Sequence, residues 1–408
     1  MDKMKLFKKE QKCRICREKK IRPILNLGDQ PLANNLQKTK ETKEFTVPLI
    51  IGFCNKCKLV QLTHTVNPNV MFKKYVWVTG TSDGARQHSQ NFYKMAQQRK
   101  SSEVKKVLEI ASNDGTFLKP FKKNNIFTIG VDPAKNISSF ANKKGIKTLA
   151  IFFNYKNSIK IKKQFGKFDF IFARNVLPHT PIPLEIIKGI KEILHEEGFG
   201  AIEFHYSKKI LDENQYDSIY HEHFFYYSVK NVRDILEKFS LYAFDTQESP
   251  ISGGSMILYF STKKKKISEK LNKILKVENK KRINTFHRWK IFAKKSKNHR
   301  GRIMKLIKKY PKVYAYGASA RSSTMLNYCG ISFKNILGIF DKNNLKHNLY
   351  TPGSKIKIIN PLAKAIRKSN SLIILSWNFY DEIYKFLKQI KYRGTIIKPL
   401  PSIKVVKL

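Results

Sequence analysis

The sequence predicts an α/β protein with three parts: a small N-terminal four-cysteine zinc domain, a doubly wound Rossmann-like domain, and a second Rossmann-like domain at the C-terminus. Two observations predict this fold class. Four of the five cysteines lie in two C-x-x-C pairs, which is a zinc-site pattern. Apolar strands then alternate with helices in two separate stretches, a pattern typical of parallel sheets covered by helices. At 408 residues the chain is also too long for one ordinary core.

The composition narrows the class of protein. The sequence has no run of about 18 apolar residues, and the N-terminal stretch lacks the apolar segment of a signal peptide. We therefore expect a cytoplasmic protein without a membrane partner. The net charge of +50 would suit a nucleic-acid partner, but lysine is spread from end to end together with Asn, Ile and Phe, the residues of A/T-rich codons. We favour an anionic small-molecule substrate, with a basic zinc protein that binds nucleic acid as the alternative.

The N-terminal domain, predicted over residues 1–75, carries the metal site. Cys13 and Cys16 form one C-x-x-C pair, and Cys54 and Cys57 form the other. Two such knuckles supply four thiolates for a closed tetrahedral Zn²⁺ site. Two disulfides or a redox motif are the alternatives, and both suit a reducing compartment poorly. A closed site leaves no coordination position for a reaction, so we expect a structural zinc ion.

The second domain, predicted over residues 76–262, should be built around four strands. The first is Val107 to Ala111, the second ends at Asp132, the third begins near Asp169, and the fourth is FGAIEFHY. Because ligands of such sheets bind beyond the carboxyl ends of the strands, the loops there are the candidate site. The other expected elements are helices over 85–99, 185–198 and 229–241 and a strand region over 242–260.

The loop after the first strand and the acid after the second point to one ligand. The loop consists of Ser112, Asn113, Asp114 and Gly115. It lacks G-x-G-x-x-G and suits an amino acid moiety better than a pyrophosphate. Glu109 and the polar loop can receive an ammonium group, and Gly115 would let the backbone approach closely. Asp132 falls where a carboxylate takes a ribose diol. S-adenosylmethionine (SAM) meets both demands, whereas an ordinary strand–turn–helix is the alternative.

Several segments resemble, in order along the chain, the SAM-dependent C-methyltransferases that act on keto-deoxysugar nucleotides. They are the two cysteine pairs, EIASNDG, GVDPA, ARNVLPHTP, YHEH, YAYGASARSSTMLNYCGI and DKNNLKHNLYTPG. The resemblance covers almost the whole chain. It implies methyl transfer from SAM to a carbon alpha to a ketone of a nucleotide-activated deoxysugar, through a base-generated enolate. A methyltransferase for another acceptor, including an oxygen, is the alternative within this class.

The segment YDSIYHEHFFYYS, residues 216–228, holds the acid–base groups that this chemistry requires. By the resemblance, His223 is the general base, Tyr220 is a hydrogen-bond donor to the enolate, and Glu222 orients His223 or a sugar hydroxyl. Tyr75 matches a family tyrosine that lies over the active site. His221 is predicted to be structural, with a metal pair as the less favoured alternative.

Further residues complete the predicted site. His179 follows the third strand and could orient the substrate, and the resemblance adds Asn175 to the cofactor site. Family members often carry a His and an Arg flanking the Gly-Gly-Ser that follows the catalytic segment. Ser252 and Ile257 stand at these positions here, and the difference concerns the identity of the substrate more than the methyl donor.

The third part, predicted over residues 263–408, begins with a lysine-rich helical connector over 263–302. A strand then leads into the turn Gly317 to Ser322 and a helix. The glycine spacing of this turn is wrong for NAD. We interpret it as an anion-binding turn at a helix N-terminus, suited to the phosphates of the substrate, with a purely structural turn as the alternative. Cys329 should be a buried helix residue.

Overall fold

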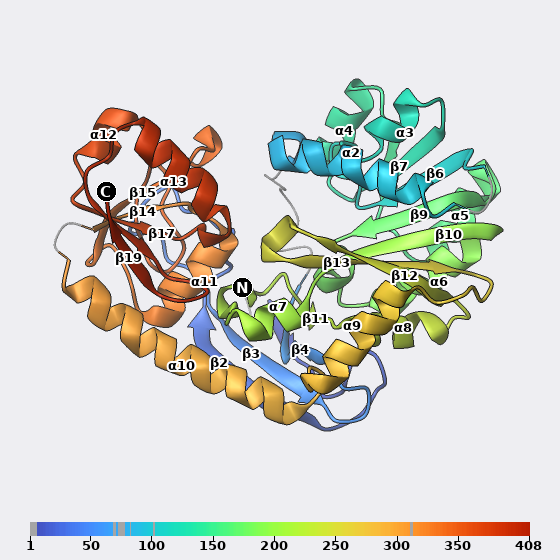
Figure 1. The fold of residues 1–408 in the computed structure, drawn as a ribbon, viewed down its shortest axis with the longest axis horizontal. Helices are drawn as coiled ribbons and strands as arrows, with labels where there is room; N and C mark the ends of the chain where they lie inside the picture. The colour runs from blue at the N-terminus through green and yellow to red at the C-terminus, as the bar shows by residue number, and fades with distance from the viewer. Residues whose placement is uncertain (1–5, 68–70, 72–77, 82, 101–102, 311–312) are drawn as a thin grey trace.

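The structure, a computed structural model, describes residues 6–67, 71, 78–81, 83–100, 103–310 and 313–408. Their strands form four sheets. In the view of Figure 1, two α/β lobes stand on either side, and the N-terminal sheet lies below and between them. The predicted site residue Tyr75 lies outside the described residues. Within them, no helix is both long and apolar enough to cross a membrane.

The N-terminal region contains a two-stranded and a four-stranded antiparallel sheet. The small sheet pairs β1 (Phe7–Lys9) with β5 (His64–Val66). The larger one has the order β11-β4-β3-β2 and consists of β2 (Ile21–Gln30), β3 (Val47–Cys54), β4 (Val60–Leu62) and β11 (Phe225–Tyr226). The strand β11 belongs to the 216–228 segment, far away in the sequence. The segment that carries the candidate base is therefore part of the sheet that also carries cysteine residues of the metal site.

The central domain contains a seven-stranded mixed sheet with the order β12-β13-β10-β9-β6-β7-β8. Its parallel part is β6 (Lys106–Ile110), β7 (Phe127–Val131), β8 (Thr148–Leu149), β9 (Phe168–Arg174) and β10 (Leu194–His205), followed by the antiparallel hairpin of β12 (Tyr242–Ser249) and β13 (Ser255–Ser261). The chain turns to opposite sides of β6, toward β7 and toward β9. This switch point of a doubly wound sheet is where a ligand binds, and it confirms the predicted fold class.

The side chains of β9 alternate between the two faces of the sheet, and helices cover both faces. Phe170 and Phe172 pack in one apolar cluster with Phe92 of α2 and Phe121 of α3, whereas Ile171 belongs to the main core, which includes side chains of α6. Successive strand residues face opposite sides, so an apolar run predicts a strand buried on both. The helices are α2 (Asp83–Gln97), α3 (Lys119–Lys123), α4 (Lys135–Lys143), α5 (Tyr155–Phe165), α6 (Pro183–Ile193), α7 (Ser207–Asp212) and α8 (Val229–Glu237).

Three predicted elements of this domain were wrong in extent. The helix expected over 229–241 ends at Glu237. The helix expected over 185–198 ends at Ile193, because Leu194 already pairs with Phe168 of β9. The strand region over 242–260 is a hairpin of two strands, β12 and β13. Its turn contains Gly253 and Gly254 with φ of +80° and +114°, which are backbone conformations that favour glycine.

The C-terminal region repeats the α/β pattern. Helices α9 (Glu269–Lys280) and α10 (Phe286–Lys308) form the predicted connector, and α10 runs along the lower edge of the molecule to the second lobe (Figure 1). The six-stranded sheet has the order β16-β15-β14-β17-β18-β19, parallel except for β19. Its elements are β14 (Val313–Tyr316), α11 (Ala320–Cys329), β15 (Ile336–Phe340), β16 (Ile358–Ile359), α12 (Ala363–Arg367), β17 (Ser371–Ile374), α13 (Tyr380–Gln389), β18 (Thr395–Lys398) and β19 (Lys404–Lys407). Cys329 ends α11 and is buried, as predicted.

Candidate active site and zinc site

The four predicted zinc ligands converge. Their sulfur atoms all lie within 4.8 Å of one another, and the Sγ–Sγ distances are 3.6 Å for Cys13 and Cys57 and 3.5 Å for Cys16 and Cys54. A tetrahedral zinc ion with Zn–S bonds of about 2.3 Å requires sulfur atoms about 3.8 Å apart. All five cysteines are free, so the disulfide alternative is excluded in this structure. The four thiolates fit Zn²⁺, and no position remains for a substrate.

The first cysteine knuckle is connected to the catalytic segment through Arg14. Its buried guanidinium donates to Gln61 Oε1 at 3.0 Å and to the Leu62 carbonyl at 2.6 Å. It also lies 5.7 and 5.6 Å from the ring centroids of Phe224 and Phe225. The Leu62 amide in turn donates to the Phe224 carbonyl at 2.9 Å. The metal site therefore supports β11, the strand that begins two residues after the YHEH sequence.

His223 is held by two hydrogen bonds. Its Nδ1 donates to the Ser218 carbonyl at 2.8 Å, and its Nε2 lies 2.7 Å from the Tyr220 hydroxyl. A carbonyl only accepts, so the proton is on Nδ1 and Nε2 accepts from Tyr220. Burial is the main cause that holds the pKa of His223 well below its usual range, and the neighbouring His179 adds to it. The ring is therefore neutral, with a basic nitrogen that is covered by Tyr220.

Three histidines from three segments form a cluster, which we call the histidine cluster: His179, His205 and His223. His179 ends the 3₁₀ helix η3 (Leu177–His179) after β9, and its ring centroid lies 4.6 Å from that of His223. His205 ends β10, and its ring lies 6.4 Å from His223. Burial lowers the pKa of His179 to about 4 and that of His205 to about 3. His205 was missed in the sequence, although its place at the carboxyl end of the fourth strand is a signal.

Glu222 and His221 both bind the N-terminal region. The half-buried Glu222 carboxylate accepts a bond from Asn34 Nδ2 at 2.7 Å. Burial raises the pKa of Glu222 to about 7, with the Asn34 bond opposing. His221 Nε2 donates to the Val47 carbonyl at 3.1 Å, which fits a structural role. In this structure the Ser218 carbonyl, and not Glu222, orients His223.

The candidate cofactor loop lies at the switch point of the seven-stranded sheet. Asp132, after β7, accepts from the Asn113 amide at 2.9 Å through Oδ2 and from the Ala134 amide at 2.9 Å through Oδ1. These bonds fix the carboxylate and leave a second lone pair on each oxygen for a ligand. Asn175, after β9, has a left-handed backbone (φ 53°) and donates its amide to the Glu203 carbonyl at 2.7 Å. The structure thus brings Asn113 and Asp132 together and keeps Asn175 on the adjacent strand end.

Several polar atoms of this loop lack partners. Among the described residues, the buried atoms Glu109 Oε2, Ser112 Oγ and Asp114 Oδ2 have no hydrogen-bond partner. Buried acceptors are normally satisfied, so this set fits the ammonium group of an amino acid ligand. The loop is covered by the segment Val78 to Thr81, because a Cβ on Gly80 would lie 2.5 Å from Asp114 Oδ2. This set of acceptors therefore fits the amino acid end of SAM.

The fold of the loop itself requires glycine at position 115. Its φ is +73°, and a Cβ at this position would come within 2.6 Å of the Ile146 side chain. Glycine is thus required by backbone conformation and by packing of the loop on Ile146.

Arg174 is a second residue that sequence reasoning missed. It ends β9 and lies between two buried carboxylates, with Nε 3.4 Å from Glu109 and Nη1 3.6 Å from Glu203. Its guanidinium covers the face of the Phe117 ring. Burial raises the pKa of Glu109 to about 8 against the opposing effect of Arg174. Glu109 is therefore mostly protonated at neutral pH in the absence of a ligand.

Replacing Glu109 by glutamine should weaken SAM binding by about 10- to 100-fold, because a buried carboxylate that pairs with an ammonium is lost. In the wild type, binding at pH 7 should release close to one proton, because Glu109 must ionise from a pKa of about 8. Calorimetry in two buffers with different ionisation enthalpies measures this release. The exposed Glu382→Gln serves as the control. Unchanged affinity and proton release in E109Q would contradict the assignment.

The C-terminal domain contacts the catalytic segment through Arg321 of α11. The guanidinium donates to both oxygens of Asp217, at 3.0 Å each. Trp377 Nε1 donates to Asp217 Oδ2 at 2.8 Å, and the Arg321 guanidinium lies 4.8 Å from the Trp377 ring centroid. Arg321 lies in the turn that we interpreted as an anion site. Part of its charge is thus already neutralised by Asp217.

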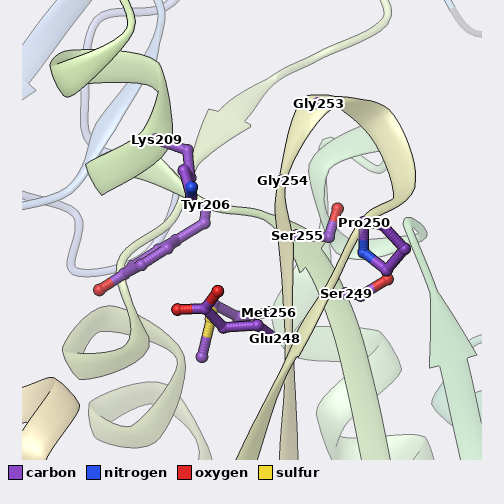
Figure 2. A pocket seen from close by; sticks show the side chains of 9 residues that line it. All are labelled: Tyr206, Lys209, Glu248, Ser249, Pro250, Gly253, Gly254, Ser255 and Met256. Carbon is purple, nitrogen blue, oxygen red and sulfur yellow. The ribbon is translucent and has the colours of Figure 1, made fainter. Parts of the chain in front are cut away.

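A cavity of about 420 Å³ lies beside the tip of the β12–β13 hairpin (Figure 2). Figure 2 shows the side chains of Glu248 and Met256, which come from the two hairpin strands, below the tip of the hairpin. They line the same cavity as Tyr206 and Lys209. The lining residues are Tyr206, Lys209, Glu248, Ser249, Pro250, Gly253, Gly254, Ser255 and Met256. Ile257, next along β13, is buried in an apolar cluster. The side chain of Ser252 lies outside the described part.

Comparisons with known proteins agree with this organisation. Three family descriptions match in succession: a zinc binding domain over residues 13–72, a methyltransferase domain over 85–243, and a C-methyltransferase C-terminal domain over 250–401. With the SAM-type fold and the four-cysteine cluster, they define a SAM-dependent methyltransferase with a zinc-binding N-terminal region. The C-terminal match, over residues 250–401, is to a domain of C-methyltransferases.

Individual relatives were also found. The chain is 27% identical over 404 residues to the C-methyltransferase NovU of Streptomyces niveus, covering 97% of this chain and 96% of the relative. Among solved structures, the magnesium protoporphyrin IX methyltransferase of Synechocystis PCC 6803 with bound SAM has 14% identity and a TM-score of 0.32, covering 43% of this chain and 79% of that one. A SAM-dependent methyltransferase of Clostridium acetobutylicum has 13% identity and a TM-score of 0.34, covering 45% and 93%.

Proposed function

We propose that this C-methyltransferase acts on a carbon alpha to a ketone of a nucleotide-activated deoxysugar, through an enolate. The observation that carries the proposal is the chain of hydrogen bonds from the Ser218 carbonyl through His223 to the Tyr220 hydroxyl. A neutral imidazole with a basic Nε2 beside a phenol supplies a proton acceptor and a proton donor in one place. The likeness to a C-methyltransferase along 97% of the chain supports transfer to carbon.

The proposed reaction uses both groups. As the ketone enters, the Tyr220 hydroxyl turns from His223 Nε2 to the carbonyl oxygen, and Nε2 takes the alpha proton. The electrons of the C–H bond form the enolate, whose oxygen is stabilised by Tyr220. When bound, SAM supplies an electrophilic methyl group, which the enolate carbon accepts as the C–S bond breaks. The proton on His223 then leaves to solvent.

The remaining site residues would orient the two ligands. Glu222, held by Asn34, is suited to a sugar hydroxyl, and His179 packs edge-on against His223 and limits its motion. Tyr75 stays a proposal from the family resemblance. Glu109 and the loop Ser112 to Gly115 would receive the amino acid end of SAM. Asp132 and Asn175 are the proposed contacts of its nucleoside.

The phosphates of the substrate would bind at the N-terminus of α11 in the C-terminal domain. Ser319 caps this helix, and its Oγ accepts from the Ser322 amide at 3.2 Å. The ammonium group of Lys346 lies nearby and donates to the Ala318 carbonyl at 2.8 Å. A helix N-terminus with a lysine beside it favours an anion. The charge of Arg321, which is shared with Asp217, would shift toward the phosphate on binding.

Incubation with SAM and dTDP-4-keto-6-deoxyglucose tests the proposal. We expect a sugar nucleotide heavier by one CH₂ unit, with deuterium lost from the alpha carbon when a deuterated substrate is used. Methylation that retains the alpha deuterium would indicate an oxygen acceptor. Binding of SAM without methylation of any keto-deoxysugar nucleotide would overturn the assignment of the substrate.

A further inference from the structure

The orientation of one buried amide, that of Gln215, determines the protonation of a histidine in the active site. Gln215 Nε2 donates to the Glu213 carboxylate at 2.7 Å and to the Gly253 carbonyl at 2.9 Å. Both of these groups are acceptors, so the nitrogen must face them. Gln215 Oε1 therefore faces the other way and can only accept. Gln215 is fully buried, which leaves the amide no alternative arrangement with water.

Gln215 Oε1 has two neighbours. His205 Nε2 lies 2.8 Å away, and Arg321 Nη2 donates to the same oxygen at 3.3 Å. Because Oε1 only accepts, Nε2 of His205 must carry the hydrogen. Burial and the positive charge of Arg321 lower the pKa of His205 to about 3, so the ring is neutral. Its other nitrogen, Nδ1, is therefore an unprotonated hydrogen-bond acceptor.

This acceptor differs from the ring nitrogens of His223. In His223 both ring nitrogens are occupied, by Ser218 and Tyr220. In His205, no donor from the described part of the chain is bonded to Nδ1, although the residue is only 5% exposed. Nδ1 is not among the fully buried side-chain atoms that lack a partner, so it is open to the site. An open acceptor without a protein partner is available for a hydrogen bond from water or from a ligand. The ring lies in the histidine cluster, 6.4 Å from the ring of the candidate base.

We propose that His205 Nδ1 accepts a hydrogen bond from a ring hydroxyl of the methyl acceptor, beside the reacting carbon, and so selects hydroxylated over deoxygenated sugars. This inference rests on the proposed function. His205 is the specificity residue, and Gln215 is a positioning residue that keeps Nδ1 unprotonated. A sugar without the hydroxyl would leave Nδ1 unpaired, for which we expect a preference of about 10-fold or more in kcat/KM.

The experiment compares two acceptors, dTDP-4-keto-6-deoxyglucose and its 2-deoxy counterpart, with SAM in excess. The wild type should prefer the hydroxylated sugar about 10-fold or more, and His205→Ala should reduce this ratio to about 1. His205→Asn keeps an acceptor at the δ position and should recover part of the preference. His287→Ala removes an exposed histidine of α10 and should leave the ratio unchanged.

A second measurement tests the tautomer without a substrate. In ¹⁵N NMR of the histidine-labelled protein, His205 should show a protonated Nε2 and an unprotonated Nδ1, and Gln215→Leu should produce a mixture of tautomers. This NMR measurement still tests the proposed tautomer if His205→Ala does not fold. A protonated Nδ1 in the wild type, or an acceptor preference that survives H205A or is absent in the wild type, would overturn the inference. Absence of any methylated sugar would instead overturn the proposed function and remove the inference with it.

Discussion

Replacing His223 by alanine should lower kcat for carbon methylation by about 10² to 10⁴-fold, the range that a positioned general base contributes. SAM affinity should stay unchanged, because the proposed cofactor residues follow other strands. Tyr220→Phe should cost less than His223→Ala, since it removes a stabilising donor but leaves Nε2 of His223 free. Steady-state kinetics on the keto-sugar and SAM titration by calorimetry measure both effects.

The pH dependence gives an independent check on the role of His223. Its pKa is held well below the usual range, mainly by burial. The base therefore stays unprotonated as the pH falls through about 6.5, where an ordinary histidine becomes charged. We therefore expect that protonation of His223 causes no loss of kcat/KM as the pH falls from 8 to 6.5. A steep decline centred on 6.5, or activity retained in H223A, would contradict the assignment of this residue as the base.

Replacing Cys54 by serine should release the zinc ion and abolish most of the methyltransferase activity, although this sulfur would not touch a substrate. Structural zinc contributes on the order of 10–16 kcal/mol of apparent binding free energy in zinc-finger peptides. Its loss should loosen the first knuckle, Arg14 and the pairing of β11 with β4. We expect faster amide hydrogen exchange in residues 216–228 and a lower unfolding temperature.

The matched control is Cys329→Ser. Cys329 is buried at the end of α11, away from the metal cluster, with its sulfur 3.3 Å from the Tyr216 hydroxyl. C329S should keep one zinc ion per chain by metal analysis. Full zinc content in C54S, or full activity of the zinc-free protein, would refute the structural role of this site.

The sequence predicted most of the framework, and the reasons are local. Cysteine spacing indicated the metal site, and apolar runs flanked by turns indicated the strands of both α/β sheets, because these signals lie within short windows. The error at the end of α6 has the same cause. The spacing of isoleucines continues the helical pattern into Leu194, whereas the end of the helix depends on pairing with Phe168 of a distant strand.

The parts of the candidate site that were missed depend on contacts between distant segments. Asn34 and Glu222 are 188 residues apart in sequence, and Arg321 and Asp217 are 104 apart. Likewise, the tautomer of His205 depends on Gly253 and Glu213 through one amide. Family resemblance indicated which residues gather at the site. It did not indicate that both nitrogens of His223 are occupied, which follows only from the folded geometry.

The pairing of β11 with β4 bears on how this enzyme could be recombined with its relatives. Phe225 and Tyr226 form a ladder with Gln61 and Val60 of the N-terminal sheet. A chimera that exchanges only residues 1–75 would therefore join a foreign edge strand to the native 216–228 segment. The unit to exchange therefore consists of two segments that are distant in sequence, residues 1–75 and residues 216–228. The residues proposed to transfer the proton would be exchanged together with the cysteine-bearing sheet.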